Sequence, residues 1–541
     1  MRKTSKIIAS LFGVALLSYA NSYAYTYEPG RILSGQTNSS YEFILADSPW
    51  LTSVNPIGIM KFQRDNFSYA LASYGYESGG VRNYSDAESS RDFFAESRSI
   101  YRISDKVVLS GGISYENFTG ENMSGSVWIN PYSRPFDIVE FTSENQGQKN
   151  LEMYNIDGAV AVQLFEGFTL AGQMVFKSAN YAKMKDLRYK SSFSDMDVTL
   201  GIGYSLWDRF DIGASYTFSQ EVEGIKFSMG GTTDKVYNNL VSFGAFWGTS
   251  STYSTISHNY VKSSTQPYID LSHSLSLQLS AGILDNLFLY LEGSYGFSSG
   301  SYGLDSYSSV VHTLNDNTSY NISGALQYSH SSNRHSLSGS YLKTSMVNYQ
   351  TIWTESSSNS ITTITYSDPR HAGTTDYSVT EFKYRGDFDI KGITPKWQVE
   401  LYATLYSRDI FAEQYPFYRR QILNSNILGA SLRYNLTLRN TNILNFSLAS
   451  GYSFGSGTKY YDAYYVTPSD AMTQPRTSDE MLEAEWMYLT SARYAISPKL
   501  GYDFEIKQNI RIFTELQYSY EAYSSLDEQR HSCTLRVGCN F

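Results

Sequence analysis

The last twelve residues, RHSCTLRVGCNF, alternate strictly between apolar side chains and polar or small ones up to the final position. A period of two is the mark of a β-strand whose two faces lie in different environments. Chain ends of soluble domains are usually frayed and polar, whereas here the apolar face continues to Phe541. The pattern leaves two interpretations, a strand of an ordinary soluble sandwich or a strand with one face in lipid.

Alternating segments recur along nearly the whole chain after residue 66, and we find no convincing helical period. The sequence therefore predicts an all-β chain of many antiparallel strands. In the last strand, the side chains assigned to lipid are Cys533, Leu535, Val537 and Cys539. The side chains assigned to the lumen of a barrel are Thr534, Arg536, Glu515 and Gln517.

The N-terminus has the layout of a secretory signal peptide. Three basic residues precede a mostly apolar run, Ile7–Leu17, and Ser22 and Ala24 occupy the small-residue positions before a cleavage site. The apolar run is too short to cross ~30 Å of hydrocarbon as a helix. We therefore expect residues 1–24 to be a signal peptide and the mature chain to be exported.

The connections between the predicted strands come in two sizes. Tight turns rich in Asp, Asn, Gly and Ser alternate with longer connections, the largest of which cover about residues 120–149, 348–375 and 455–480. Short periplasmic turns and long extracellular loops are typical of outer-membrane barrels. An open sheet edge in lipid would leave backbone groups unpaired. We therefore expect residues 63–541 to form a transmembrane antiparallel β-barrel in the bacterial outer membrane.

Counting tight turns gives 18 strands. The interval between the turns at 207 and 284 is wide enough for one more pair, Val236–Trp247 and Tyr253–Lys262. We expect about 20 strands, with 18 as the alternative. A barrel of this size encloses more space than inward side chains can fill. A final strand that ends in an aromatic residue resembles the assembly signal of Gram-negative outer-membrane proteins, and the resemblance gives Phe541 that role.

The composition limits the classes of molecule that the protein is expected to bind. The 48 tyrosines fit the aromatic girdles of a membrane barrel, although a tyrosine-rich secreted β protein would share this excess. The net charge of −10 argues against nucleic acid. The expected partners are outer-membrane lipid and another outer-membrane protein or lipoprotein.

The segment before the barrel, residues 25–62, contains ADSPWLTSVNPIGIMKF. Within it, Asn55, Pro56 and Gly58 resemble the Asn-Pro-Ala-Gly-Leu element near the N-terminus of the long-chain fatty-acid transporter family. That family and its type IX secretion relatives are 14-stranded barrels with an N-terminal plug, so the resemblance implies a plug here. It covers a short stretch, Ile57 replaces the usual Ala, and Asn-Pro also forms ordinary turns. The whole chain resembles uncharacterised outer-membrane barrels of Bacteroidota, which carry over no functional residue.

We expect no catalytic, metal or cofactor site. Pentapeptides around Ser298 and Ser453 match Gly-x-Ser-x-Gly, but a nucleophile elbow needs a strand-to-helix turn in an α/β sheet. The 7 histidines show no metal-ligand spacing with Asp or Cys. Aromatic residues recur in the long loops. They are the tyrosines of KYYDAYY (Lys459–Tyr465), Trp128 and Trp353. Such residues either form a platform that binds sugars or peptides, or pack the loops against each other.

Two functions follow from this organisation. The first is a solute channel or passive transporter that residues 25–62 and the long loops partly plug. The alternative is a non-transporting accessory subunit of another outer-membrane import or secretion complex. A TonB-dependent transporter is disfavoured because the N-terminal segment is too short for a globular plug domain. The sequence identifies no solute.

Overall fold

The computed structural model describes residues 29–32, 38–207, 209–231, 234–254, 258–306, 309–358, 361–392, 394–438, 442–507 and 510–541. The predicted signal peptide, residues 1–24, lies outside this range. Among the described residues, no helix is both long enough and apolar enough to cross a bilayer.

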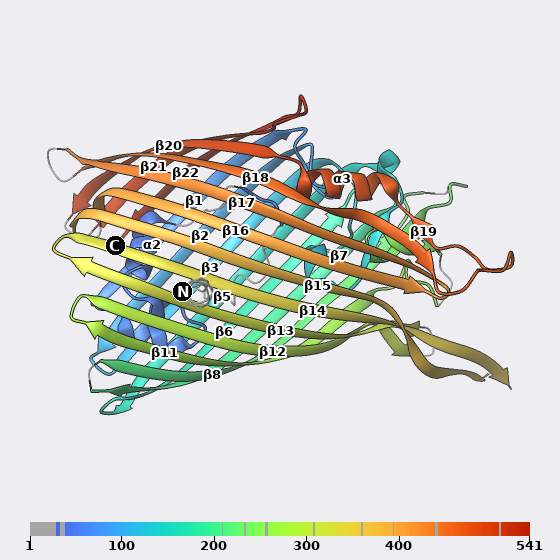
Figure 1. Ribbon diagram of the computed structural model, residues 1–541, viewed down its shortest axis with the longest axis horizontal. Coiled ribbons are helices and arrows are strands. Elements are labelled where there is room, and N and C mark those ends of the chain that lie inside the picture. Colours follow the sequence, from blue (N-terminus) through green and yellow to red (C-terminus); the bar gives the residue numbers. More distant parts are fainter. Residues whose placement is uncertain are drawn as a thin grey trace, which may run out of the picture.

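Eighteen antiparallel strands form one closed sheet (Figure 1). Each strand pairs with the next one of the set, and β1 pairs with β22 to close the ring. The strands are β1 (Asn66–Gly79), β2 (Ser89–Ser104), β3 (Val107–Met123), β5 (Gly147–Phe165), β6 (Phe168–Lys183), β7 (Arg188–Leu206), β8 (Phe210–Ser228), β11 (Gln266–Leu284), β12 (Leu287–Ser306), β13 (Ser309–His330), β14 (Asn333–Ser358), β15 (Ile361–Lys391), β16 (Thr394–Gln414), β17 (Phe417–Thr437), β18 (Ile443–Tyr464), β20 (Arg493–Lys507), β21 (Ile510–Tyr523) and β22 (Gln529–Asn540). The predicted antiparallel barrel is confirmed, with the smaller of the two strand numbers.

The extra pair predicted between residues 236 and 262 is not part of the barrel wall. Instead, β9 (Asn238–Gly244) and β10 (Trp247–Thr252) join β4 (Asp137–Glu140) and β19 (Arg476–Thr477) in a separate four-stranded sheet. Five successive residues of β9 are buried, so both of its faces are covered by protein. A wall strand keeps one face toward lipid, and the first choice of about 20 wall strands is therefore wrong.

The connections differ between the two ends of the barrel. At one end, here called the turn end, strands meet in two-residue connections such as 105–106, 166–167, 285–286 and 331–332. At the other, here called the loop end, the longest connections cover residues 124–146, 229–265 and 465–492. The loop predicted at 348–375 is mostly strand instead. There β14 and β15 pair only with each other beyond Gln350 and Gly373, and they form a hairpin that projects past the wall (Figure 1).

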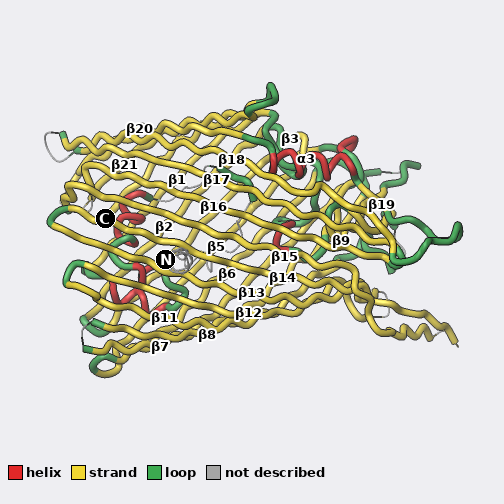
Figure 2. The backbone as a smooth tube through the Cα atoms, viewed as in Figure 1, coloured by secondary structure: helices red, strands yellow, loops and turns green. Residues whose placement is uncertain are grey.

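Short helices accompany the barrel (Figure 2). In the described part of the chain they are α2 (Ser39–Leu45), η1 (Pro49–Thr52), η2 (Pro56–Lys61), η3 (Pro131–Ser133), η4 (Ser143–Asn145) and α3 (Asp479–Thr490). The expectation that no segment is helical was wrong at α3. Its side chains at Met481, Leu482, Tyr488 and Leu489 are buried, in the spacing of one helix face.

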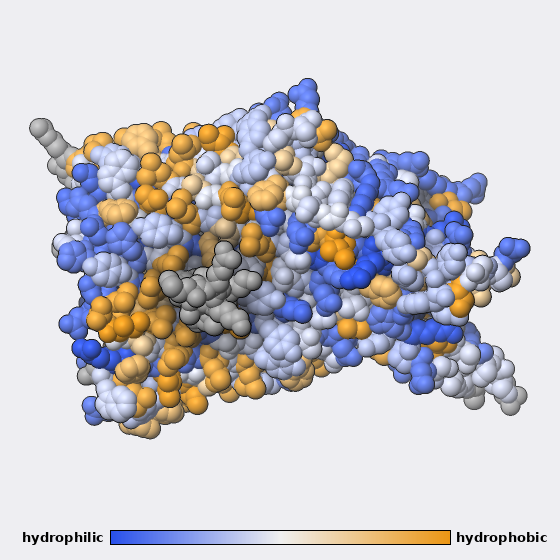
Figure 3. Space-filling view, in the orientation of Figure 1, coloured by the Kyte–Doolittle hydropathy of each residue, from blue (hydrophilic) through white to orange (hydrophobic). Residues whose placement is uncertain are grey.

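Apolar side chains point outward over the half of the barrel nearer the turn end. Figure 3 shows apolar residues gathered over this half and hydrophilic residues over the other. On β13, the outward side chains of Tyr328 and Tyr320 flank Ile322, and all three are exposed. Exposed apolar residues on neighbouring strands include Leu337, Leu401, Leu428 and Leu448. An apolar band flanked by aromatic rings is the outer surface of a transmembrane barrel.

Phe541 lies at the seam where the barrel closes. Its backbone exchanges two hydrogen bonds of 2.8 Å with Ser68, and its side chain is 50% exposed. Deleting Phe541 removes both bonds and an outward aromatic ring, so we expect a several-fold lower yield of folded, heat-modifiable protein in membranes. Phe541→Tyr keeps the backbone and the ring, and should fold like the parent. An unchanged yield after the deletion would contradict the assigned role.

Candidate functional site

Residues 38–62, here called the inner segment, lie against the inner wall of the barrel near the turn end. The helix α2 begins after Asn38, whose side chain accepts hydrogen bonds from the amides of Ser40 and Tyr41. The apolar side chains of α2 and of Phe62 pack on inward-facing residues of strands close to β1. These wall residues are Phe67, Tyr69, Leu71, Ile100, Val108 and Phe513. The inner segment is therefore anchored by apolar contacts beside the strand into which it leads.

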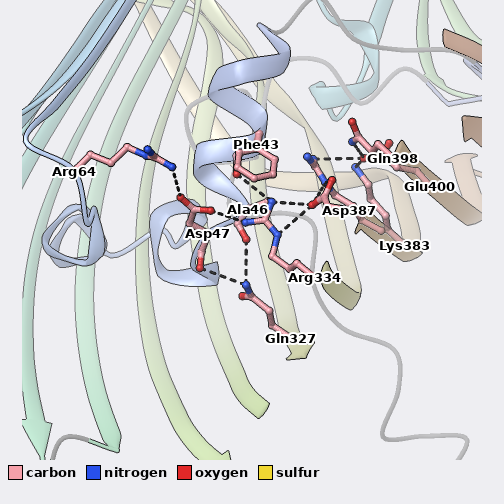
Figure 4. Close-up of polar contacts among 11 residues, drawn as sticks. Phe43, Ala46, Asp47, Arg64, Gln327, Arg334, Lys383, Asp387, Gln398 and Glu400 are labelled. Atoms are coloured by element: carbon pink, nitrogen blue, oxygen red, sulfur yellow. Dashed lines mark hydrogen bonds and ion pairs between the residues drawn. The ribbon is translucent and has the colours of Figure 1, made fainter. Parts of the chain in front are cut away.

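On the opposite side, Arg334 of β14 joins the inner segment to the wall (Figure 4). Its guanidinium donates to Asp47 at 2.5 Å, to Asp387 of β15 at 2.8 Å and to the Phe43 carbonyl at 3.3 Å. The guanidinium also lies 4.3 Å from the centre of the Phe43 ring. Arg334 and Asp387 are both buried, so each charge depends on the other for compensation.

The ion pairs continue along the wall beyond Arg334. Arg385 pairs with Asp387 at 3.1 Å and with Glu400 at 3.6 Å, and Lys383 pairs with Glu400 at 3.2 Å. Burial raises the pKa of Asp47 in the inner segment, against the lowering effect of Arg334 and Arg64. Asp47 therefore holds a proton at a higher pH than an exposed aspartate does.

Asn55 docks on the wall through its side-chain amide. Its Nδ2 donates to the backbone carbonyls of Ile202 and Ala214, at 3.2 Å and 3.0 Å, and to Gln278 Oε1 at 2.8 Å. Its Oδ1 accepts from the Ile57 amide at 3.2 Å and so caps η2, which begins with Pro56. A side chain that both donates and accepts is needed at this position, and asparagine supplies both.

Glycines of the wall make room for this docking. A Cβ at Gly201 would lie 2.0 Å from Asn55 Oδ1, and one at Gly203 would lie 2.1 Å from Ile57 Cδ1. Within the inner segment, a Cβ at Gly58 would lie 1.8 Å from the Trp50 carbonyl oxygen. Gly201 and Gly203 were not predicted from the sequence as docking positions, although glycine inside a strand is a signal of close backbone approach.

Further polar contacts extend around the circumference. The pairs are Lys61–Asp211 at 2.7 Å, Ser53–Glu292 at 2.7 Å, Trp50–Ser280 at 2.9 Å and Asn38–Asn540 at 2.7 Å. Arg102 of β2 donates to the carbonyls of Met60 and Phe62. The inner segment thus contacts wall strands on several sides of the lumen.

The described residues before the inner segment lie nearer the loop end. The Gly30 carbonyl accepts from Arg493 at 2.7 Å, and the Ile32 carbonyl accepts from Tyr402 at 2.9 Å. The Arg493 guanidinium lies 4.0 Å from the centre of the Tyr488 ring of α3. Residues 29–32 therefore connect the N-terminal part of the chain to the elements of the loop end.

The long loops form a second internal structure, here called the loop layer, which comprises the four-stranded sheet and α3. Phe243 of β9 packs in one apolar cluster with Ala372 and Ala412 of the wall. Arg408 of the wall pairs with Glu485 of α3 at 2.6 Å, and both side chains are buried. The charge of Glu485 is thus compensated by Arg408 inside the loop layer. Burial raises the pKa of Asp137 in β4 to about 6.

Alternate residues of the last two strands lie on opposite faces of the wall. Arg536 and Glu515 are buried on the inward face and pair at 2.9 Å, with Lys499 a further 3.3 Å from Glu515. Gln517 donates to Ser497 at 2.9 Å, and Thr534 pairs with Gln517 across the strands. The exposed outward residues of β22 are Cys533, Leu535 and Val537, and Cys539 is partly exposed.

The two Gly-x-Ser-x-Gly matches lie inside barrel strands, Ser298 in β12 and Ser453 in β18, and neither is at a strand-to-helix turn. Ser298 accepts a hydrogen bond from Asn317 at 3.0 Å. Over the ranges that the structure describes, no group of three or more His, Cys, Asp or Glu side chains could hold a metal ion.

A family profile described as "Family of unknown function (DUF6850)" matches residues 56–541. No curated protein matches the chain. Among solved structures, the toluene transporter TbuX of Ralstonia pickettii is 10% identical, with 90% of this chain and 91% of that chain covered and a TM-score of 0.30. The toluene transporter TodX of Pseudomonas putida is 9% identical, with 97% and 96% covered and a TM-score of 0.30. The FpvAI–pyocin S2 complex is 10% identical, with 88% and 66% covered and a TM-score of 0.38. These similarities concern the fold alone.

Proposed function

The chain belongs to the DUF6850 family of unknown function, and we propose that it is an outer-membrane solute channel gated by its own N-terminal segment. In this proposal the turn end faces the periplasm and the loop end faces the outside. The closed ring and the apolar outer band support a membrane location, because lipid tolerates no open sheet edge.

The inner segment is proposed to act as the gate because it occupies the turn end of the lumen. An 18-stranded ring encloses more space than side chains alone can fill, so an internal segment is needed to close it. The inner segment and the loop layer lie at opposite ends of this space. The first closes the periplasmic side, and the second closes the outer side.

The observation that carries the proposal is the number of polar contacts on the side remote from β1. The inner segment is held there by hydrogen bonds, by the ion pairs Asp47–Arg334 and Lys61–Asp211, and by one apolar cluster in which Trp50 and Ile57 pack on the wall. Polar surfaces form hydrogen bonds with water when they separate, whereas separating two apolar surfaces exposes apolar side chains to water at a cost in free energy. The apolar anchor beside β1 then serves as the hinge.

Planar-bilayer conductance tests the channel. We expect the intact protein to show low conductance, and deletion of residues 38–62 to raise it several-fold. Gly203→Leu should have the same effect at full chain length, because the new side chain collides with Ile57. Gly293→Leu is the matched control, since a Cβ there meets no atom within 4 Å.

The alternative function predicts the opposite result. An accessory subunit would have a permanently sealed lumen and a stable partner. The channel is refuted if the parent, the deletion variant and Gly203→Leu all show no conductance, while the protein purifies in fixed proportion with another outer-membrane protein. The subunit role then replaces it.

A further inference from the structure

A row of aromatic rings crosses the outer face of strands β15 to β18 near the loop end. Neighbouring ring centres lie 6.2 Å apart for His371–Phe411, 5.6 Å for Phe411–Tyr418 and 5.0 Å for Tyr418–Tyr465. Tyr415 and Tyr461 extend the row, at 6.3 Å from Tyr465 and 6.4 Å from Tyr418. These six rings are here called the aromatic row.

The aromatic row points away from the lumen. On β16, the side chains of Arg408, Ile410 and Ala412 are buried, so the alternate residues Phe411 and Glu413 face outward. The outermost rings are freely accessible, with Tyr415 67% and Tyr461 58% exposed. Loop packing therefore does not account for these tyrosines.

The aromatic row also lies outside the apolar band. The last exposed leucines of that band are Leu405 on β16 and Leu428 on β17, and beyond Leu428 the exposed side chain of Ile422 lies across from Asp409. Phe411 lies six residues beyond Leu405, or roughly 20 Å along the strand, and Tyr418 lies four residues beyond Ile422, or roughly 13 Å. Because the charged pair Asp409–Arg420 lies at the level of the rings on the same outer face, the aromatic row lies beyond the continuous apolar band and is accessible to water.

Polar groups are fixed among the rings. Glu413 accepts a hydrogen bond from the Tyr465 hydroxyl at 2.6 Å and contacts His371 Nδ1 at 2.7 Å. Arg420 forms a two-point ion pair with Asp409, at 3.0 Å and 2.6 Å. The rings are therefore held in place before any ligand arrives, which lowers the entropy cost of binding.

We propose that the aromatic row binds a neutral oligosaccharide chain at the cell surface. The C–H faces of sugar rings stack on tyrosine and phenylalanine, while hydroxyl groups bond to nearby carboxylates and guanidiniums. Arg420 is already neutralised by Asp409, so the row lacks the cationic surface that a phosphate-rich lipid headgroup would need. This binding is independent of the proposed channel, because the row lies on the outer face.

Affinity electrophoresis of the full-length protein in detergent tests the proposal. The gels contain starch, laminarin, xylan or galactomannan as neutral polysaccharides, and lipopolysaccharide as the charged comparison. We expect retardation by at least one neutral polysaccharide. The double variant Tyr418→Ala/Tyr465→Ala should weaken that binding about tenfold, because two stacking surfaces are lost.

Two control variants separate stacking from general damage. Tyr418→Phe/Tyr465→Phe keeps the rings and should retain most of the binding. Tyr464→Ala removes an exposed tyrosine outside the aromatic row and should bind like the parent. Heat-modifiability confirms that each variant is folded.

Three outcomes overturn the inference. They are no retardation by any of the four neutral polysaccharides, unchanged retardation of the double alanine variant, and binding to lipopolysaccharide alone. The conductance experiment measures a different property. The channel proposal can therefore be refuted while sugar binding is observed, and sugar binding can be refuted while conductance is observed.

Discussion

Replacing Arg334 with alanine lowers the stability of the folded protein by about 3–5 kcal/mol, the cost of breaking a buried ion pair on one side. The reason is that Asp387, whose side chain is only 1% exposed, loses its shortest ion pair, and the Asp47 carboxylate loses its ion pair with the wall. The inner segment then has one fewer attachment on the side remote from β1. Urea unfolding in lipid vesicles measures the stability, and protease cleavage within residues 38–62 measures release of the segment.

Lys61→Ala is the matched control for Arg334→Ala. Lys61 also joins the inner segment to the wall, through Asp211 at 2.7 Å, but its side chain is 38% exposed. An exposed pair contributes about 0–1 kcal/mol, so the loss should be small. Equal losses in the two variants, or an inner segment that stays protected in Arg334→Ala, would show that burial does not set the strength of this attachment.

Val537→Arg destabilises the barrel by about 2–4 kcal/mol, because it places a charge at mid-height of the lipid-facing side of β22. Val537 lies between Leu535 and Cys539 on the outward face and is 45% exposed. Thr534→Arg, on the inward face of the same strand, should cost much less, since a lumenal guanidinium can keep polar partners. Urea unfolding in vesicles compares the two. Similar costs would mean that the faces of β22 are assigned the wrong way round.

The alternation of β22 predicts two different faces, because a period of two assigns every residue to one side once the lipid side is known. Alternation could not decide where β9 belongs. The run from Asn239 to Phe243 was correctly recognised as strand, but sequence alone does not show what covers each face. In the structure, protein covers both.

The attachment of the inner segment could be predicted only in part. The resemblance drew attention to Asn55 and Pro56, but Arg334 and Asp47 are 287 positions apart, and no local pattern links them. The helix α3 had a local start signal, although no helical period was recognised there. Ser478 precedes two acidic residues, Asp479 and Glu480, in its first turn, which is a typical helix start.

Residues 29–32 contact elements of the loop end, and the inner segment that follows them contacts the wall near the turn end. Ile32 and Asn38 are six residues apart, so the chain between them reaches at most about 20 Å when fully extended. A displacement that carries Asn38 farther than about 20 Å from Ile32 must therefore pull Gly30 away from Arg493, whose guanidinium contacts the Tyr488 ring of α3. In the proposed channel, a force that withdraws the inner segment toward the periplasm would therefore also disturb the contact of Arg493 with α3 at the loop end.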